Sequence, residues 1–222
     1  MTRDIDIRPV NLVKYFNCLD TLKQMEENYQ DNILGAKQNV ELHLYLDRQH
    51  LLEIDKTLRM QRHVERYSLL RQFAEGVVCD AACGCGYGSY LLSTNPDVQS
   101  VIGLDINQDV IDFANKEYSS PKTKFLNADI NNWISDQQID TLISVETIEH
   151  IADRYILQRF CDNNNINHVI LTYPSKKSTH FNPHHIYDFK LHDILDIFGK
   201  FTCYRHFNWQ WEYDVVFLMR SS

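Results

Sequence analysis

The stretch that decides the fold is residues 77–88, which read Val77-Val78-Cys79-Asp80-Ala81-Ala82-Cys83-Gly84-Cys85-Gly86-Tyr87-Gly88. A short apolar run leads into a loop with glycine at every second position, and a helical pattern follows it. Because glycine has no Cβ, the backbone of this loop is able to pass close to a ligand at the start of the helix. The spacing is not the Gly-x-Gly-x-x-Gly of dinucleotide binding, and no Gly-Lys-Ser/Thr follows as a phosphate-binding loop requires. The sequence therefore predicts a ligand-binding turn of another kind.

From Val77 onward, short apolar runs alternate with helical patterns. This alternation predicts βαβ units, a parallel sheet and right-handed crossovers. The last two runs, Phe201–Phe207 and Val215–Met219, are so close in the chain that they have to pair antiparallel. The runs before them are Val77–Val78, Ser100–Leu104, Lys124–Leu126, Thr141–Val145 and His168–Thr172.

Residues 1–60 lack this alternation, and we expect an N-terminal helical extension there, followed by one domain over residues 61–222. Tyr15–Tyr29 and Arg59–Phe73 carry apolar residues at spacings of three and four, which is typical of packed helices. Gly76 is predicted to end the second of these helices. Residues 40–54 fit a strand and a helix equally well.

The composition indicates an ordinary soluble globular chain. Of 222 residues, 44% are hydrophobic and 23% are charged, with a formal net charge of −8, which disfavours a disordered chain and a membrane protein. The acidic balance also weakens the case for a nucleic-acid partner, since affinity for phosphates comes largely from Lys and Arg. We expect a cytoplasmic protein whose cysteines are reduced and buried, because they lack the spacing of a disulfide framework or a zinc site and no secretory signal is recognisable.

Two aspartates follow the next two predicted strands. Asp105 closes the second strand, 19 residues after Gly86, where a carboxylate accepts hydrogen bonds from a pair of ribose hydroxyls. Asp129 follows the third strand and is placed to accept from an adenine amino group, with Ile106 and Ile130 on the two faces of the ring. The joint spacing therefore indicates a ligand that contains adenosine.

From about Arg66 to Met219 the sequence resembles the class I S-adenosylmethionine-dependent methyltransferases. Asp80-x-Ala82-x-Gly84-x-Gly86 is similar to the first motif of that family, with alanine in place of its first glycine. The resemblance implies S-adenosylmethionine as the cofactor and an α/β fold, a seven-stranded doubly wound sheet of order 3-2-1-4-5-7-6 with strand seven antiparallel. The cofactor-binding residues that we predict are Asp80, Ala82, Gly84, Gly86, Tyr87, Asp105, Ile106, Asp129, Ile130, Glu146, Arg66 and Tyr67.

The residues that we expect near the methyl acceptor follow the fourth predicted strand. The first of them are Glu146, Glu149 and His150. The chain has no Asn/Asp-Pro-Pro-Tyr/Phe group here, which disfavours methylation of the exocyclic amines of DNA bases. The Glu-x-x-Glu-His arrangement resembles small-molecule O-methyltransferases and a branch of RNA-end 2′-O-methyltransferases. We predict these three residues as catalytic, with His150 as the base that takes the hydroxyl proton. The alternative is a divalent ion that they hold together with a further histidine, and the sequence alone assigns no metal ligand.

A histidine-rich loop follows the fifth predicted strand. Residues 182–189 resemble the Asn-Pro-x-His-Val-Arg-Glu-Phe stretch of methyltransferases in surface-glycan gene neighbourhoods, and His63-x-x-Arg66-Tyr67 resembles the helix that closes the cofactor pocket in the same group. The sequence favours O-methylation of a small hydroxylated or glycan-like acceptor, without a membrane partner. The alternatives are a metal-dependent 2′-O-methyltransferase of RNA termini and a non-catalytic domain that binds the cofactor or a partner. The predicted acceptor contacts are Tyr173, His184, His185 and Tyr187.

Overall fold

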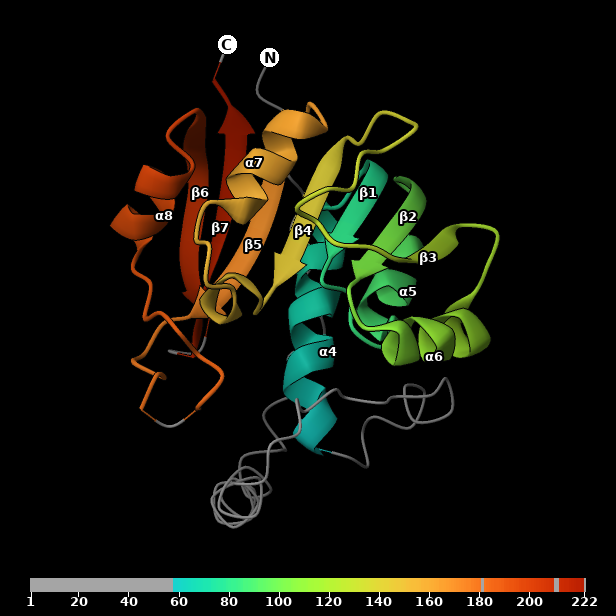
Figure 1. The fold of residues 1–222 in the computed structure, drawn as a ribbon, viewed down its shortest axis with the longest axis horizontal. Coiled ribbons are helices and arrows are strands. Elements are labelled where there is room, and N and C mark those ends of the chain that lie inside the picture. The colour runs from blue at the N-terminus through green and yellow to red at the C-terminus, as the bar shows by residue number, and fades with distance from the viewer. Residues whose placement is uncertain (1–57, 181, 210–211, 222) are drawn as a thin grey trace. The chain divides into compact units, whose positions relative to one another are not determined.

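The computed structural model describes residues 58–180, 182–209 and 212–221, so the predictions for residues 1–57 lie outside the described part. Within it, seven strands form one sheet in the order β3-β2-β1-β4-β5-β7-β6 (Figure 1). β7 is antiparallel to both β5 and β6, and the other neighbouring strands are parallel. The predicted fold class and strand order are confirmed. The strands are β1 (Gly76–Ala81), β2 (Val98–Asp105), β3 (Thr123–Asn127), β4 (Thr141–Val145), β5 (His168–Pro174), β6 (Phe201–Trp209) and β7 (Tyr213–Arg220).

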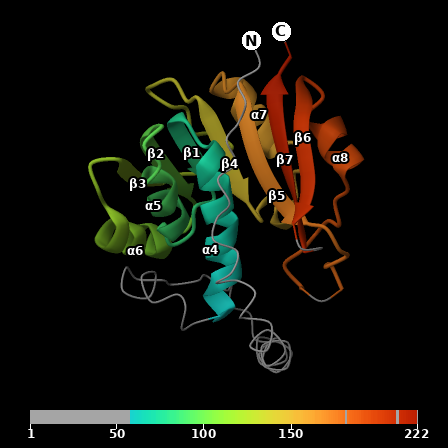
Figure 2. The same cartoon turned by 180° about the vertical axis from the view of Figure 1, so that it is seen from behind.

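Helices cover both faces of the sheet (Figures 1 and 2). One hydrophobic cluster joins one face of the sheet to α4, α5 and α6, and a second joins the other face to α7 and α8. The described part of the chain therefore has a helix–sheet–helix layering. The helices are α4 (Leu58–Leu70), α5 (Tyr87–Ser93), α6 (Gln108–Tyr118), α7 (Ile156–Asn163) and α8 (Leu191–Ile197), with the 3-10 turns η2 (Arg71–Phe73) and η3 (Ile148–His150).

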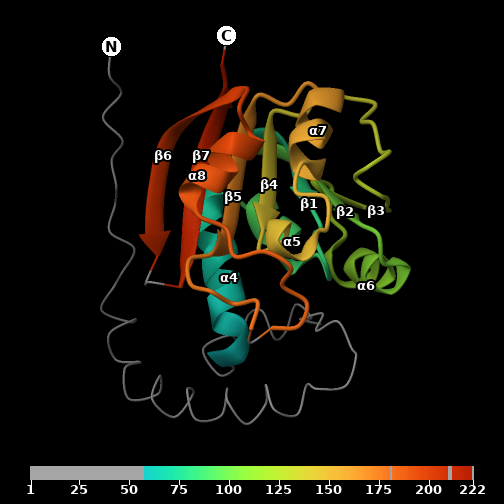
Figure 3. The same ribbon diagram turned by 60° about the vertical axis from the view of Figure 1, so that its left-hand side comes forward.

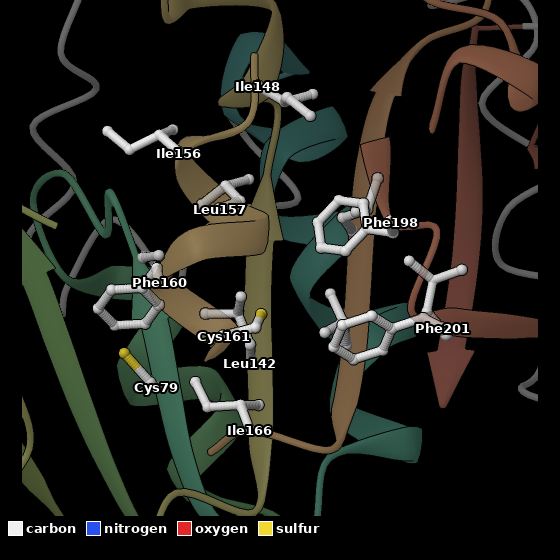
Figure 4. Packing of buried hydrophobic residues seen from close by; sticks show 14 of the residues in the cluster. Cys79, Leu142, Ile148, Ile156, Leu157, Phe160, Cys161, Ile166, Phe198 and Phe201 are labelled. Carbon is white, nitrogen blue, oxygen red and sulfur yellow. The ribbon is translucent and has the colours of Figure 1, made fainter. Parts of the chain in front are cut away.

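The central strands are buried on both faces. All of β4 is buried, as is β5 up to its last residue, which explains why these strands read as continuous apolar runs rather than as alternating ones. Figure 4 shows Phe160 and Cys161 of α7 packed near Cys79 of β1 and Leu142 of β4. The cysteines of the glycine loop are buried free thiols, as predicted.

The predicted helix Arg59–Phe73 is present as α4 followed by η2. The prediction that Gly76 ends this helix is wrong, because the chain is already extended at Ala74 and Gly76 begins β1. A Cβ at Gly76 would lie 2.2 Å from Oδ2 of Asp140. The same oxygen accepts a hydrogen bond of 2.7 Å from the backbone N–H of Val77, so the close approach of Asp140 requires the glycine.

The carboxyl ends of β1 to β5 meet at one edge of the sheet, since these strands are parallel (Figure 3). Open α/β sheets bind their ligands at this edge. Most of the site residues predicted from the sequence lie at the ends of these strands or in the loops that follow them, whereas Arg66 and Tyr67 lie on α4. No helix in the described ranges combines the length and the apolar character that a membrane span needs.

Candidate active site

The glycine loop after β1 holds three residues in the left-handed region, Ala82 (φ 61°), Gly84 (φ 53°) and Gly86 (φ 84°). A Cβ at Gly86 would lie 2.6 Å from the Cβ of Ala114, so the packing of the protein itself demands that glycine. A Cβ at Gly84 would meet nothing within 4 Å. Ala82 shows that this loop accommodates an alanine at positive φ, so packing within the described structure does not require glycine at position 84, and the space beside it is open.

Asp80 organises the loop from beneath. Its carboxylate is fully buried and accepts hydrogen bonds from the hydroxyl of Tyr67 at 3.1 Å and from that of Ser89 at 2.6 Å. Burial raises the pKa of Asp80 to about 7, although these two hydrogen bonds oppose the shift. Asp80 therefore ties α4 and α5 to β1. Ser89 was not among the predicted site residues, and its signal in the sequence is a hydroxyl in the first turn of the helix that follows the loop.

Tyr67 also explains the third glycine of the motif. Its ring packs edge-on against Tyr87, with centroids 5.6 Å apart. A Cβ at Gly88 would lie 2.2 Å from Cζ of Tyr67, so glycine at this position lets α4 lie directly on α5. Tyr67 and Tyr87 are both buried and support the loop.

Asp105 joins the end of β2 to the glycine loop. Its Oδ2 accepts from the backbone N–H of Gly84 at 2.9 Å, and its Oδ1 accepts from that of Asn107 at 2.9 Å. Each carboxylate oxygen has a second lone pair for a ligand hydroxyl. The neighbouring Ile106 is 72% exposed at this edge. The structure thus brings the predicted loop and the predicted ribose residue into direct contact.

The end of β3 lies beside Asp105, whose carbonyl oxygen accepts a 2.9 Å hydrogen bond from the backbone N–H of Ala128. Asp129 and Ile130 follow and are half-buried. Oδ1 of Asp129 accepts from the backbone N–H of Asn131 at 2.8 Å. Open space at Gly84, lone pairs on Asp105 and an exposed apolar side chain beside it fit a cofactor with an adenosine group.

Glu146 follows β4 with φ 48°, a conformation that is uncommon for a residue other than glycine and that recurs at functional sites. Its Oε1 accepts from the hydroxyl of Thr172 at 2.8 Å, and its Oε2 lies 3.5 Å from the guanidinium of Arg66. Arg66 is itself buried, with its guanidinium 4.6 Å from the ring centroid of Tyr213. Glu146 therefore links α4 to the ends of β4 and β5. Thr172 was not among the predicted site residues, and its signal is a polar residue in an apolar strand.

Glu149, His150 and His185 form the group that we call the acceptor cluster. Their ligand atoms all lie within 4.8 Å of one another, and Nε2 of His150 is 3.9 Å from Oε1 of Glu149. The two imidazole rings meet edge to face, with centroids 4.6 Å apart. Glu149 is fully buried and neither of its carboxylate oxygens has a hydrogen-bond partner. Burial, and next the charge of Glu146, hold the pKa of Glu149 well above its usual range.

Hydrogen bonds fix the histidine loop against η3. The backbone N–H of Ile186 donates to the carbonyl oxygen of Glu149 at 2.8 Å, and Asp188 accepts from the backbone N–H and the hydroxyl of Thr179. Nδ1 of His150 lies 3.0 Å from the carbonyl oxygen of His184. The folded loop therefore brings His185, which lies 35 positions after His150 in the sequence, to the predicted catalytic pair.

The other predicted acceptor residues take different positions. The side chain of His184 is exposed. The hydroxyl of Tyr187 donates to the carbonyl oxygen of Ala152 at 2.8 Å. Tyr173 is fully buried against Phe189, and its hydroxyl has no hydrogen-bond partner. The acceptor roles of these residues stay predictions.

Comparison with known proteins finds a matching family and solved structures with a similar fold. Residues 78–163 match the family described as "Methyltransferase domain", and no curated protein matches the chain. The N-methyltransferase NodS from Bradyrhizobium japonicum WM9, solved with S-adenosyl-L-homocysteine, is similar in fold, with a TM-score of 0.59, 14% identity and coverage of 75% of this chain and 89% of NodS. Magnesium protoporphyrin IX methyltransferase from Synechocystis PCC 6803, solved with bound S-adenosylmethionine, is also similar in fold. Its TM-score is 0.54 at 18% identity, and the match covers 82% of this chain and 86% of that protein.

The family match begins within β1, at Val78, and covers the glycine loop, Asp105, Glu149 and His150, but it ends before His185. The strand order and the open space at Gly84 agree with it. The chain therefore carries an S-adenosylmethionine-dependent methyltransferase domain.

Proposed function

We propose that this domain transfers a methyl group to a hydroxyl oxygen of a small hydroxylated or glycan-like acceptor. The observation that carries the proposal is the acceptor cluster. Because a carbonyl oxygen can only accept a hydrogen bond, the contact of Nδ1 with His184 leaves Nε2 of His150 with the lone pair that faces Glu149. The cluster thus presents groups that accept protons.

This arrangement suits an alcohol better than an amine. A hydroxyl group is a weak nucleophile, so its proton has to be removed, or its pKa lowered, as the methyl group is transferred. A neutral amine attacks through its own lone pair and needs only alignment. The chain has no Asn/Asp-Pro-Pro-aromatic group whose carbonyls would align an amine.

The cofactor supplies an activated methyl group on its sulfonium. We propose that Gly84 and Gly86 form the backbone surface for its methionine part, that Asp105 accepts from its ribose hydroxyls, and that Asp129, between Ile106 and Ile130, accepts from its adenine amino group. Asp80, Tyr67 and Tyr87 then act by holding the loop, since all three are buried. Arg66 and Glu146 close this side of the site through their ion pair.

The division of the chain into residues 1–60 and a catalytic domain of residues 61–222 belongs to the same proposal. The boundary falls within α4, in which Tyr67 donates a hydrogen bond to Asp80 of β1 and Arg66 pairs with Glu146. The fold does not choose the acceptor, because the two similar structures are named for an N-methyltransferase and for a porphyrin methyltransferase.

The test uses methyl-labelled S-adenosylmethionine and separated glycan, lipid, RNA and protein fractions. We expect label in a small hydroxylated or glycan acceptor, with a methyl ether in the mass spectrum of the product. His150→Ala should lower turnover while S-adenosylhomocysteine binding, measured by calorimetry, stays unchanged. Label on an amino nitrogen would refute the O-methylation proposal, and cofactor binding without transfer to any fraction would favour the non-catalytic alternative.

A further inference from the structure

We infer that the surface beside the acceptor cluster binds the phosphoryl group of a phosphorylated acceptor, such as a sugar phosphate. Four cationic side chains, which we call the basic rim, carry the binding, and they are Arg154, Lys176, Lys177 and Lys190. A phosphorylated acceptor narrows the substrate class of the proposed function and rests on that function. Binding of a phosphoryl group by the basic rim itself is measurable without methyl transfer.

The basic rim spans two segments that are hydrogen-bonded to each other. Arg154 lies between η3 and α7, and the three lysines lie in the connection between β5 and α8. In this connection the hydroxyl of Tyr187 donates to the carbonyl oxygen of Ala152 at 2.8 Å, and the backbone N–H of Ile186 donates to that of Glu149 at 2.8 Å. Figure 3 shows the loop after β5, in orange, next to the turn that follows β4. The two segments therefore share one surface beside the acceptor cluster.

The basic rim is an excess of positive charge in an acidic chain. Residues 175–190 hold three lysines and one aspartate, whereas the whole chain has a formal net charge of −8. The three lysines are exposed, and Nζ of Lys190 donates to the carbonyl oxygen of Ser175 at 3.1 Å, next to Lys176 in the chain. Within the described ranges, the lysines and arginines that pair with carboxylates are others, namely Arg62, Arg66, Lys116, Arg159, Lys200 and Arg220.

The acidic side chains next to the rim lysines are occupied by protein donors. Oδ1 of Asp188 accepts from the backbone N–H groups of Ser178 and Thr179 at 2.6 and 3.1 Å, and its Oδ2 accepts from the hydroxyl of Thr179 at 2.7 Å. Asp193 accepts from the backbone N–H of Lys190 at 2.8 Å. Lys177 also interacts electrostatically with Asp188. One aspartate therefore offsets part of the charge of three lysines, and the remainder is available to an anion.

Arg154 supplies evidence that solvated lysines alone would not. Its Nε is buried and has no hydrogen-bond acceptor in the described structure, whereas buried polar groups in proteins are nearly always paired. The adjacent Asp153 does not act as the acceptor, because it pairs with Arg159 and accepts from the backbone N–H of Tyr155. A phosphoryl oxygen at Nε would provide the missing acceptor, and the planar fork of a guanidinium suits two such oxygens.

A phosphoryl group fits the basic rim better than a carboxylate or a nucleic acid. A carboxylate carries one negative charge, whereas a phosphate monoester carries about −1.5 to −2 at neutral pH and offers three acceptor oxygens. A nucleic acid binds through many Lys and Arg contacts along its backbone, and the rim is confined to two short segments of an acidic chain. Because these segments adjoin His150 and His185, a sugar phosphate on the rim would have its hydroxyls held beside the acceptor cluster. The rim residues are therefore positioning residues.

The binding experiment is an NMR titration of the full chain, saturated with S-adenosylhomocysteine, with inorganic phosphate, glucose 1-phosphate, glucuronate and glucose. We expect saturable shifts at the backbone amides of residues 152–155 and 176–180 with the two phosphates, weaker binding of glucuronate and none of glucose. Arg154→Gln should weaken glucose 1-phosphate about tenfold, and Lys177→Gln about threefold. Lys124→Gln is the matched control, because Lys124 is exposed on β3 and the substitution removes the same charge; it should bind like the wild type.

Thermal unfolding shows whether each variant folds, and if Arg154→Gln does not, the double variant of Lys176→Gln and Lys177→Gln replaces it. Equal affinity of the rim variant and of Lys124→Gln for glucose 1-phosphate would overturn the inference and leave the proposed function intact. Equal binding of glucose and glucose 1-phosphate by the wild type would do the same.

The second experiment follows labelled methyl groups from S-adenosylmethionine into the separated small-molecule and RNA fractions. We expect a small labelled product that an anion exchanger retains. Retention lost after phosphatase identifies a phosphate monoester, and retention lost only after phosphodiesterase identifies a diester or diphosphate. An uncharged labelled product, or label in RNA, would overturn the inference. Label on an amino nitrogen of a phosphorylated product would support the inference and refute the proposed O-methylation.

Discussion

Replacing Gly84 by alanine should weaken cofactor binding with only a small loss of stability. The backbone at this position has φ 53°, and a Cβ added there would meet nothing within 4 Å. The variant therefore bears only the cost of an alanine in the left-handed region, about 1 to 2 kcal/mol. Ala82 already adopts φ 61° in the same loop, so the fold accommodates the change.

The matched variant is Gly86→Ala, two residues further on. Its Cβ would lie 2.6 Å from the Cβ of Ala114 and 2.8 Å from Cε1 of Phe125, at φ 84°. Overpacking and the left-handed backbone together should cost about 2 to 5 kcal/mol. Neither neighbour moves easily, since both belong to the core between α6 and β3.

Two measurements separate the effects. Urea unfolding should show a loss of about 1 to 2 kcal/mol for Gly84→Ala and a larger loss for Gly86→Ala. Calorimetry with S-adenosylhomocysteine should show at least a tenfold loss of affinity for Gly84→Ala, about 1.4 kcal/mol. Wild-type affinity in Gly84→Ala would refute the placement of the cofactor against this loop. Equal destabilisation by the two substitutions would refute the assignment of Gly86 to packing and of Gly84 to ligand approach.

Three further predictions follow from single contacts. Asp105→Ala should weaken S-adenosylhomocysteine by about 1.5 to 3 kcal/mol in calorimetry, the scale of a lost charged hydrogen bond, and unchanged affinity would contradict the ribose assignment. Because the pKa of Asp80 is raised to about 7, the folded state binds more protons than the unfolded state between about pH 4 and pH 7. From about pH 5 to about pH 7 the wild type should therefore lose roughly 2 to 3 kcal/mol of unfolding free energy relative to Asp80→Asn, as measured by urea unfolding. A stability difference that is independent of pH would contradict this. Leu142→Ala, in the fully buried β4, should cost about 2 to 5 kcal/mol with an unchanged denaturant slope, and a smaller loss would indicate that the site collapses.

The sheet was predictable because its signals are local. A buried parallel strand is a short apolar run, and the connection between the last two strands is too short for a crossover, so their antiparallel pairing follows from chain length. The position of β7 between β5 and β6 was implied only by the family resemblance. Gly76 shows where local reasoning ends. It resembles a helix C-cap in the sequence, but the reason for the glycine is the carboxylate of Asp140, 64 residues later.

In the candidate site, contacts between the ends of adjacent strands were predictable, whereas contacts that depend on the folding of a loop were not. The contact between Gly84 and Asp105 follows from two adjacent parallel strands, whose ends must meet. The role of Thr172 depends on the register in which it faces Val145. The approach of His185 to Glu149 depends on the fold of the loop after β5, which no periodicity in the sequence encodes.

Several of the acidic residues behind the net charge of −8 lie at the carboxyl edge of the sheet, where most of them contact protein donors. Asp80 and Asp105 each accept two hydrogen bonds from protein donors, and Glu146 pairs with Arg66 and Thr172. These carboxylates are committed to positioning the loop and α4. Among the acidic residues predicted for the site, Glu149 is the one whose carboxylate has no hydrogen-bond donor in the described structure. The carboxyl group without a donor thus lies on the acceptor side, beside two histidines, whereas the carboxylates on the cofactor side are held by protein donors.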